Sequence, residues 1–495
     1  MKKTIKLFRY TFSEKVTALI CLAGLILTMI PIYRLSYYSI PYYDDYGAAA
    51  GNVAWAKQFG TSYLTGAVVH ARQMWWAWEG TYFARVMMAL DPVIWGEKYH
   101  FIGIVMIITS LLFSVFVFIY MICRKLLRAA KWDSVSSAAI VCEITVLFIY
   151  TAQQGFYWYN SGVKYILGFS IWLLSICASV MTLVSKKLYE NIIYGILSAA
   201  LIFCAAGSNF VTVLQSLIVS VSIFAAGLYF CKKRALFLIP SLIADFYGAK
   251  LCLLAPGNTK RASAYEGMGA FDAIIASFKT GFEFFDKFLD WRTLLLFLIA
   301  LPVSYRIVRM SGITFKIRIF IILAAWSVCL YASGFTPNLY SSGEVVLSRV
   351  INVIKLVFQL LLWINMTYFL GLLSQIKTNG RKKWKGYVIW PAAVIWLTAW
   401  IFFFRIQPNP IGTYSAFGAD FYLKSGQAEL FHEEYTQRLD LLHSGDSDIV
   451  FKPYTNMPWF LGWTDISSDP DSEANRFMAD FYHKSSIKVE EDAGD

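Results

Sequence analysis

Charged residues are scarce in this 495-residue chain: Asp, Glu, Lys and Arg together make up only 15% of it, whereas 58% of the residues are hydrophobic. Soluble globular domains average about 25% charged and 45–50% apolar residues. The scarcity of charge therefore excludes an ordinary soluble protein and predicts a polytopic membrane protein. Aromatic residues make up 17% of the chain, which suits a protein with many membrane–water interfaces.

Cysteine is missing from the long polar segments, since all eight Cys lie in apolar stretches or at their ends. A disulfide framework in an oxidising outer compartment would need Cys in those polar segments, so neither disulfides nor a Cys-based zinc site is expected. The five His residues are scattered, and the sequence predicts no His-based metal site. No internal repeat or low-complexity tract stands out.

Acidic residues are nearly missing from six short segments, which hold 23 of the 44 Lys and Arg and have only three acidic residues in or beside them. The net charge of +12 therefore reflects the positive-inside bias that orients membrane spans, and it does not indicate a nucleic-acid partner. The basic segments are 2–15, 124–131, 186–187, 232–234, 306–318 and 377–385.

Apolar runs of about 20 residues, the length that crosses a bilayer as a helix, predict about eleven spans and an all-α fold. The first run ends without a small-residue cleavage pattern, so it is interpreted as a retained anchor and not as a signal peptide. The basic segments then place the N-terminus in the cytoplasm and the C-terminus outside. The expected spans are 16–34, 101–123, 137–151, 165–185, 191–207, 210–230, 235–255, 293–310, 319–335, 350–374 and 387–405.

The chain divides into a multispan region, 1–405, and an extracytoplasmic C-terminal region, 406–495. Two long outer loops are expected within the multispan region, at 35–100 and 256–292. Functional residues are sought in these outer segments, because the inner connections are short and uniformly basic. In the C-terminal region, residues 427–442 have the pattern of an amphipathic helix.

Two adjacent carboxylates, Asp44 and Asp45, follow the first span by about ten residues. Adjacent acids repel when both ionise, so such a pair favours a site where a proton, a cation or a positive substrate offsets the repulsion. They are candidates for a general base or for ligands of a divalent cation. The alternative is a solvated turn after Pro41 that caps the next helix.

The stretch 68–90 is expected to form a helix lying in the interface plane, since it is rich in aromatic residues but too polar to span. Trp78, Glu79 and Arg85 lie on it. The alternative for its charged residues is that they are solvated or reach toward the headgroups along the membrane surface.

Three further groups of polar residues lie at outer ends of spans. The turn at 255–261 carries Asn258, Lys260 and Arg261, and Arg349 precedes the expected tenth span, so both could contact phosphate. The loop 153–164 contains Tyr157, Asn160 and Lys164 and could hold a sugar. A plain turn, snorkelling basic side chains and an aromatic belt are the respective alternatives.

These features together resemble the GT-C class of integral-membrane glycosyltransferases. The carrying residues are the Asp pair early in the first outer loop, Trp-Glu-Gly at 78–80 followed by Arg85, and Ala-Pro-Gly-Asn at 255–258 followed by Arg261. Within the class, the chain is similar to a group of bacterial multispan proteins with these motifs, and the resemblance covers most of its length. It implies a plasma-membrane enzyme that takes a sugar from a polyprenyl phosphate on the outer face and passes it to an envelope glycan or lipid.

The resemblance implies roles for particular residues, of which only the Asp pair matches a role found across the class. Asp44 and Asp45 are the implied catalytic pair and candidate ligands of Mg²⁺ or Mn²⁺, although a direct Asp-Asp pair leaves a metal requirement open. Donor phosphate would contact Arg261, Lys260 and Arg349. Substrate would contact Trp78, Glu79, Arg85, Asn258, Tyr157 and Asn160.

A transporter or flippase of lipid-linked glycans is the alternative function. Its ionisable residues would be Glu143, Asp245 and Lys250, which lie inside expected spans, where charge is costly and usually functional. The long outer loops with juxtamembrane Asp residues, and the lack of a detectable inverted repeat, favour the enzyme. The sequence does not indicate the sugar, the acceptor or the oligomeric state.

Overall fold

The structure is a computed structural model that describes residues 13–263, 265–289, 291–345, 347–375 and 414–490. It is almost entirely α-helical, as the sequence predicts. In this described part, seven helices are long and apolar enough to cross a membrane, which makes the chain a multi-pass membrane protein. They are Glu14–Ser36, Glu97–Leu126, Tyr159–Val184, Leu188–Ala206, Phe210–Leu253, Ile317–Ser342 and Ser348–Ser374.

The sequence-based count of eleven spans is not established by these helices. One of the seven, Phe210–Leu253, covers two of the expected spans, 210–230 and 235–255, because it comprises two helices, Phe210–Cys231 and Ile239–Leu253, joined by the 3₁₀ helix Lys232–Leu238. The expected spans at 137–151 and 293–310 coincide with α6 (Lys131–Leu147) and α14 (Trp291–Met310), which are not among the seven. The span expected at 387–405 lies outside the described residues.

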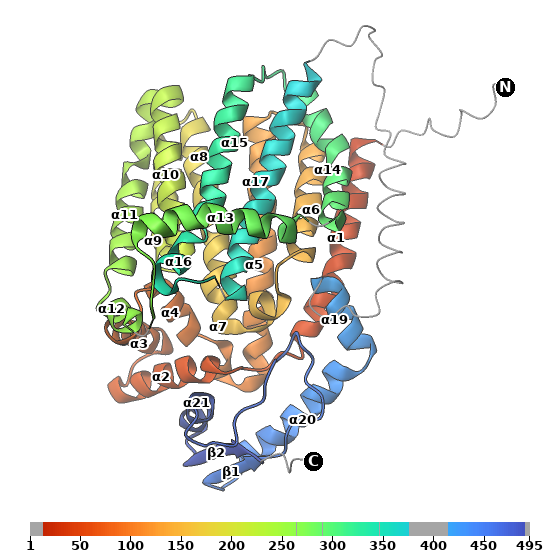
Figure 1. Ribbon diagram of the computed structural model, residues 1–495. Coiled ribbons are helices and arrows are strands. Elements are labelled where there is room, and N and C mark those ends of the chain that lie inside the picture. Colours follow the sequence, from red (N-terminus) through yellow and green to blue (C-terminus); the bar gives the residue numbers. More distant parts are fainter. Residues whose placement is uncertain (1–12, 264, 290, 346, 376–413, 491–495) are drawn as a thin grey trace, which may run out of the picture.

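Upright helices stand side by side as a bundle, and α8 packs against α9, α9 against α11, and α1 against α6 (Figure 1). Their buried faces carry branched aliphatic and aromatic side chains such as Ile104, Ile107 and Phe169. The bundle consists of α1 (Glu14–Ser36), α5 (His100–Met121), α6, α8 (Gly168–Val184), α9 (Leu188–Ala206), α10 (Phe210–Cys231), α11 (Ile239–Leu253), α14, α15 (Ile317–Ser333) and α17 (Ser348–Ser374).

The segment 35–100 contains three α-helices, α2 (Asp44–Phe59), α3 (Tyr63–Ala77) and α4 (Tyr82–Ala89), which pack on one another at one end of the bundle (Figure 1), and two short 3₁₀ helices, Pro92–Trp95 and Glu97–Tyr99. The single helix expected over 68–90 is therefore interrupted at 78–81. The interruption turns the chain so that Glu79 is buried, whereas a continuous helix would have left it on an interfacial surface.

Helix α13 (Ala270–Phe288) follows the short helix α12 (Pro256–Ala262) and lies across the upright helices, near the short helix α16 (Thr336–Ser342) (Figure 1). It packs on α15 and α16. Its buried residues recur at helical spacing, whereas Phe271 and Phe282 on its other face are each 74% exposed. The sequence pattern predicts only an outer loop, 256–292, at this place.

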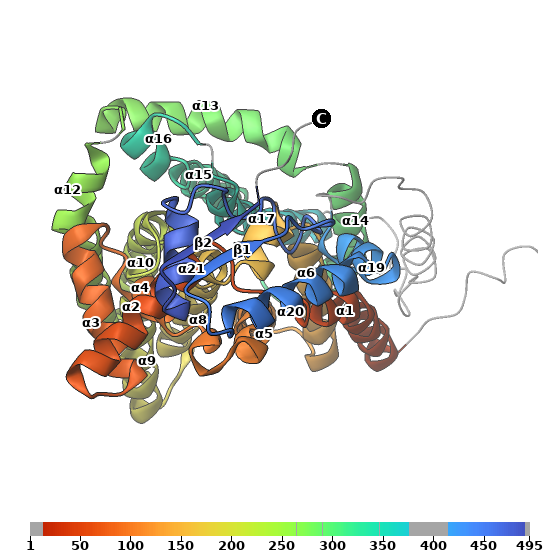
Figure 2. The same ribbon diagram turned by 90° about the horizontal axis from the view of Figure 1, so that it is seen from below.

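The C-terminal residues 414–490 lie over the end of the bundle that carries α2 (Figure 2). They form α19 (Ser415–Lys424), α20 (Gln427–Leu442) and α21 (Glu473–Tyr482), and the helix predicted over 427–442 is confirmed. Two short strands, β1 (Asp448–Phe451) and β2 (Ser486–Val489), pair in parallel, a departure from the expected all-α fold. Their buried side chains form a small core with α20 and α21: Leu442, Ile449, Phe451, Ala479, Ile487 and Val489.

Candidate functional site

Asp44 and Asp45 form the first turn of α2, directly after Tyr43. Tyr43 has φ 51° and ψ −113°, a conformation that is strained for a bulky residue and that is typically retained only where the surrounding structure requires it. Asp45 is fully buried, and its two carboxylate oxygens accept the backbone N–H groups of Tyr42 and Asn160, each at 2.9 Å. Asp45 thereby ties the start of α2 to the short helix α7 (Tyr159–Gly162).

Asp44 differs from Asp45 because it retains hydrogen-bonding capacity. Its Oδ1 is buried and makes no hydrogen bond within the described part of the chain. Burial raises the pKa of Asp44, and this effect outweighs the lowering by the nearby Arg349 guanidinium, the Asn160 amide, Arg85 and Lys164. The pKa of Asp45 is raised well above its ordinary value by burial and by the charges of Asp91 and Asp44.

Glu79 is the centre of a buried cluster of cations. Lys164 Nζ donates to both of its carboxylate oxygens at 2.6 and 2.7 Å, Arg85 approaches Oε1 at 2.7 Å, and Arg261 Nη1 donates to Oε2 at 2.7 Å. Burial opposes ionisation of Glu79, but the three cations outweigh it and hold the pKa of this carboxyl well below its ordinary value. Three cations around one carboxylate leave this group with a net charge of +2, which favours binding of an anion.

The two sequence motifs that carry the resemblance interlock at this cluster. The backbone N–H of Gly80 donates to Asn258 Oδ1 at 2.9 Å, and the Arg261 guanidinium lies 5.4 Å from the centre of the Trp78 ring. Asn258 also donates to the carbonyls of Cys252 and Leu253. Asn258 therefore holds the end of α11 against the turn that presents Glu79.

Gly80 is required where this turn meets α11. A Cβ atom at this position would lie 1.9 Å from the Cys252 carbonyl oxygen, which belongs to the backbone. We expect Gly80→Ala to force the two segments apart, to weaken the Glu79–Arg261 contact and to destabilise the protein by about 1–3 kcal/mol. Thermal unfolding of the purified protein measures the effect. Gly445→Ala is the matched control, because a Cβ there meets nothing within 4 Å, and equal midpoints for the two variants would contradict the prediction.

Arg349 lies in the first turn of α17, and its charge acts on Asp44. Its guanidinium lies 5.0 Å from the centre of the Trp158 ring, and its backbone N–H donates to Gln154 Oε1. Trp158 Nε1 and Asn160 Oδ1 are both buried without a hydrogen-bond partner among the described residues, as is Asp44 Oδ1. Unpaired buried polar atoms are costly, so their gathering in one place points to a ligand or to ordered water.

The structure places the remaining candidates differently. The Tyr157 hydroxyl donates to the Ile32 carbonyl, and its ring stacks on Phe460 in the core, so this side chain supports the fold. Lys260 is exposed, and the cations that contact Glu79 in the described residues are its neighbour Arg261 together with Arg85 and Lys164. Glu143 and Asp245 each accept a hydrogen bond from a hydroxyl on a neighbouring helix, that of Thr28 and that of Ser216 respectively.

Of the predicted metal pair, Asp45 belongs to the group of potential metal ligands that the described residues bring together, and Asp44 does not. Asp45, Asp91 and His100 place one ligand atom each within 4.8 Å of one another, and all three are buried. His100 Nδ1 lies 3.0 Å from both carboxylate oxygens of Asp91. Neither Asp91 nor His100 was a candidate from the sequence, since single acids and scattered His carry no signal until the fold assembles them.

The role of Lys164 also becomes visible only in the structure. The sequence places it in a polar, aromatic loop, but the Glu79 carboxylate it binds is 85 residues away. No protein-family model, curated protein or solved structure matches this chain.

Proposed function

We propose that this protein is a GT-C-like membrane glycosyltransferase that moves a sugar from a polyprenyl phosphate to an envelope glycan or lipid on the outer face of a bacterial plasma membrane. The observation that carries the proposal is the juxtaposition of a carboxylate with an unpaired buried oxygen, Asp44, and a cation-rich group around Glu79. A base beside an anion site is what displacement of a phosphate leaving group requires.

In the proposed reaction, Asp44 accepts the proton of an acceptor hydroxyl. The acceptor oxygen forms a bond to the anomeric carbon while the bond between that carbon and the phosphate oxygen breaks. The polyprenyl phosphate leaves with the electron pair. Arg349, Arg261 and Lys164 stabilise its negative charge through charge-assisted hydrogen bonds. Asp45 is a positioning residue, since both of its oxygens are already used to hold the backbone around Asp44.

An apolar cavity of about 300 Å³ lies between α13, α15 and α17, and it is the proposed site for the lipid part of the donor. Its lining is almost entirely apolar and includes Phe285, Phe320 and Phe358. Phe358 follows Arg349 by nine residues on α17, which is about 14 Å along a helix. Nine residues are about two and a half turns, so Phe358 lies on the opposite face of α17 from Arg349, and an isoprenoid chain on a phosphate at Arg349 would have to pass around this helix to reach the cavity.

A divalent cation fits the Asp45, Asp91 and His100 cluster by donor type. Two carboxylates and an imidazole suit Mn²⁺ better than Mg²⁺, which prefers oxygen ligands. These three residues would hold the ion, Asp45 through the second lone pair of a carboxylate oxygen that still accepts a backbone N–H, and the charge of the ion would offset the burial of both carboxylates beside the base.

Arg349→Ala tests the phosphate contact. We expect the variant to raise the KM for the lipid-linked donor about 10- to 100-fold, since one charge-assisted hydrogen bond to phosphate is worth roughly 1.5–3 kcal/mol. Steady-state transfer assays with purified protein measure the change. Lys57→Ala, which removes an exposed cation from α2, is the control. An unchanged KM in Arg349→Ala would place the phosphate elsewhere.

The pH dependence of transfer tests the role of Asp44. A general base must be ionised, and burial raises the pKa of Asp44, so kcat/KM should fall as the pH decreases through that raised pKa. The fall should lie above about pH 4, where an ordinary Asp titrates. A pH–rate profile shows it, and a fall centred near pH 4, or one that persists in the residual activity of Asp44→Asn, would assign the base to another group.

A further inference from the structure

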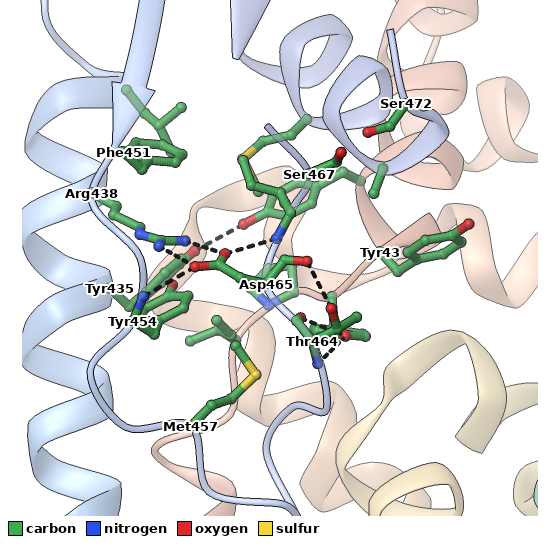
Figure 3. A pocket seen from close by; sticks show the side chains of 18 of the residues that line it. Tyr43, Tyr435, Arg438, Phe451, Tyr454, Met457, Thr464, Asp465, Ser467 and Ser472 are labelled. Carbon is green, nitrogen blue, oxygen red and sulfur yellow. Dashed lines mark hydrogen bonds and ion pairs between the residues drawn. The ribbon is translucent and has the colours of Figure 1, made fainter. Parts of the chain in front are cut away.

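A second cavity, of about 180 Å³, lies between the C-terminal region and the segment that leads into α2 (Figure 3). It is separate from the cations around Glu79, none of which lines it. Aromatic rings from both segments line it: Tyr42, Tyr43, Tyr46, Phe431, Tyr435, Phe451 and Tyr454. At about 30 Å³ per water molecule, the space corresponds to roughly six waters, a size that suits one ring-shaped ligand.

The charged groups that line this cavity disfavour the binding of an anion. Asp465 accepts hydrogen bonds from both terminal nitrogens of Arg438, at 2.7 and 2.5 Å (Figure 3). The one cation in the lining is therefore already neutralised. Arg438 is also covered, since its guanidinium lies 3.5 Å from the centre of the Tyr454 ring. The second carboxylate of the lining, Glu473, is exposed and accepts the Tyr43 hydroxyl at 3.1 Å.

Besides the tyrosine hydroxyls, the remaining polar side chains of the lining are the hydroxyls of Thr464, Ser467 and Ser472 (Figure 3). Aromatic faces combined with carboxylate and hydroxyl oxygens match a ligand that has apolar C–H faces and an edge of hydroxyl donors. A neutral pyranose sugar has this distribution. An anionic sugar would face the uncompensated Glu473.

The cavity adjoins the proposed base through Tyr43. This residue lines the cavity, and the next residue in the chain is Asp44. The strained backbone of Tyr43 is held on one side by its hydroxyl contact to Glu473 and on the other by the start of α2. The same backbone segment therefore forms the cavity wall and sets the position of Asp44.

We infer that this cavity binds a neutral sugar unit of the acceptor, and that the C-terminal region is the acceptor-binding part of the protein. The identification of this ligand as the acceptor rests on the proposed glycosyltransferase function. The binding of a neutral sugar to the cavity does not depend on catalysis. The two can be tested apart, because sugar binding is measurable without any lipid-linked donor.

The test is saturation-transfer NMR on the full-length protein in detergent, with methyl β-glucopyranoside, methyl β-galactopyranoside and N-acetylglucosamine as neutral probes and glucuronate as the anionic one. We expect saturable binding of at least one neutral probe and at least tenfold weaker binding of glucuronate. Ala474→Phe, which places a ring in the cavity from α21, should abolish the binding, and Glu473→Gln should weaken it about fivefold or more. Glu429→Gln, an exposed carboxylate outside the lining, should leave it unchanged.

The inference is overturned if no neutral probe binds saturably, if Ala474→Phe binds as the wild type does while unfolding at the same temperature, or if glucuronate binds as well as the neutral sugars. Asp44→Asn should retain sugar binding. If the sugars bind as expected and Asp44→Asn still transfers sugar normally, the acceptor cavity stands as a sugar site and the proposed catalytic function fails instead.

Discussion

Asp44→Asn should reduce kcat for sugar transfer by about 10²- to 10⁴-fold, the contribution typical of a general base. The substitution keeps the shape of the side chain, and Asp44 Oδ1 has no hydrogen bond to lose within the described structure. Burial disfavours the ionised carboxylate, so a neutral Asn should not lower the unfolding temperature. Transfer assays and thermal unfolding of the same purified samples measure both quantities.

Asp45→Asn is the matched comparison, since it makes the same carboxylate-to-amide replacement at the adjacent residue. Asp45 accepts two backbone N–H groups, and an Asn would turn an NH₂ toward one of them. We expect it to destabilise the protein by about 1–3 kcal/mol, with the loss of activity following the loss of folded protein. If Asp45→Asn left stability unchanged and abolished kcat while Asp44→Asn remained active, the two roles would have to be exchanged.

Glu79→Gln should be among the most destabilising single substitutions in the protein. Glu79 is fully buried, and Arg85, Lys164 and Arg261 all contact its carboxylate, so the substitution leaves three cations without their counter-charge. Breaking a buried ion pair by removing one partner costs about 3–5 kcal/mol. We expect a much lower yield of folded protein in the membrane and a lower unfolding temperature in detergent.

The control for Glu79→Gln is Glu266→Gln, which neutralises an exposed carboxylate in the turn after α12. It should leave yield and unfolding temperature unchanged. Wild-type stability of Glu79→Gln would show that the three cations are compensated in another way, and the cluster could then no longer be described as organised by Glu79.

The sequence was informative where a signal is local. The hydrophobic runs predicted the membrane character, and the amphipathic pattern of 427–442 predicted α20 with its bounds. The Asp pair and the two short motifs pointed to Asp44, Glu79, Arg85 and Arg261, which the structure brings into one region. Polar residues in such motifs stand out because the rest of the chain is so apolar.

Other features depend on contacts between distant residues, which local patterns do not reveal. The break at 78–81 follows from the close approach of Gly80 to the Cys252 carbonyl. The sequence did not predict it, because the residues on both sides have a helical pattern. Strands β1 and β2 have four residues each and are paired across 38 positions. The assignment of different tasks to Asp44 and Asp45 likewise needed their hydrogen-bond partners.

As the proposed general base, Asp44 should be required for the protein to use a lipid-linked sugar at the outer face of the membrane. The most direct measurement compares cells that lack this protein and are complemented with wild type, Asp44→Asn or a Glu143→Gln/Asp245→Asn double variant, each confirmed in the membrane. Both the envelope glycans and the lipid-linked sugars on each face of the membrane are quantified.

We expect Asp44→Asn to eliminate one envelope sugar while its polyprenyl-phosphate donor accumulates on the outer face, and the double variant to retain that sugar. The opposite pattern would contradict the account. If Asp44→Asn kept every glycan while the double variant trapped a lipid-linked precursor on the inner face, the protein would be a transporter of lipid-linked glycans.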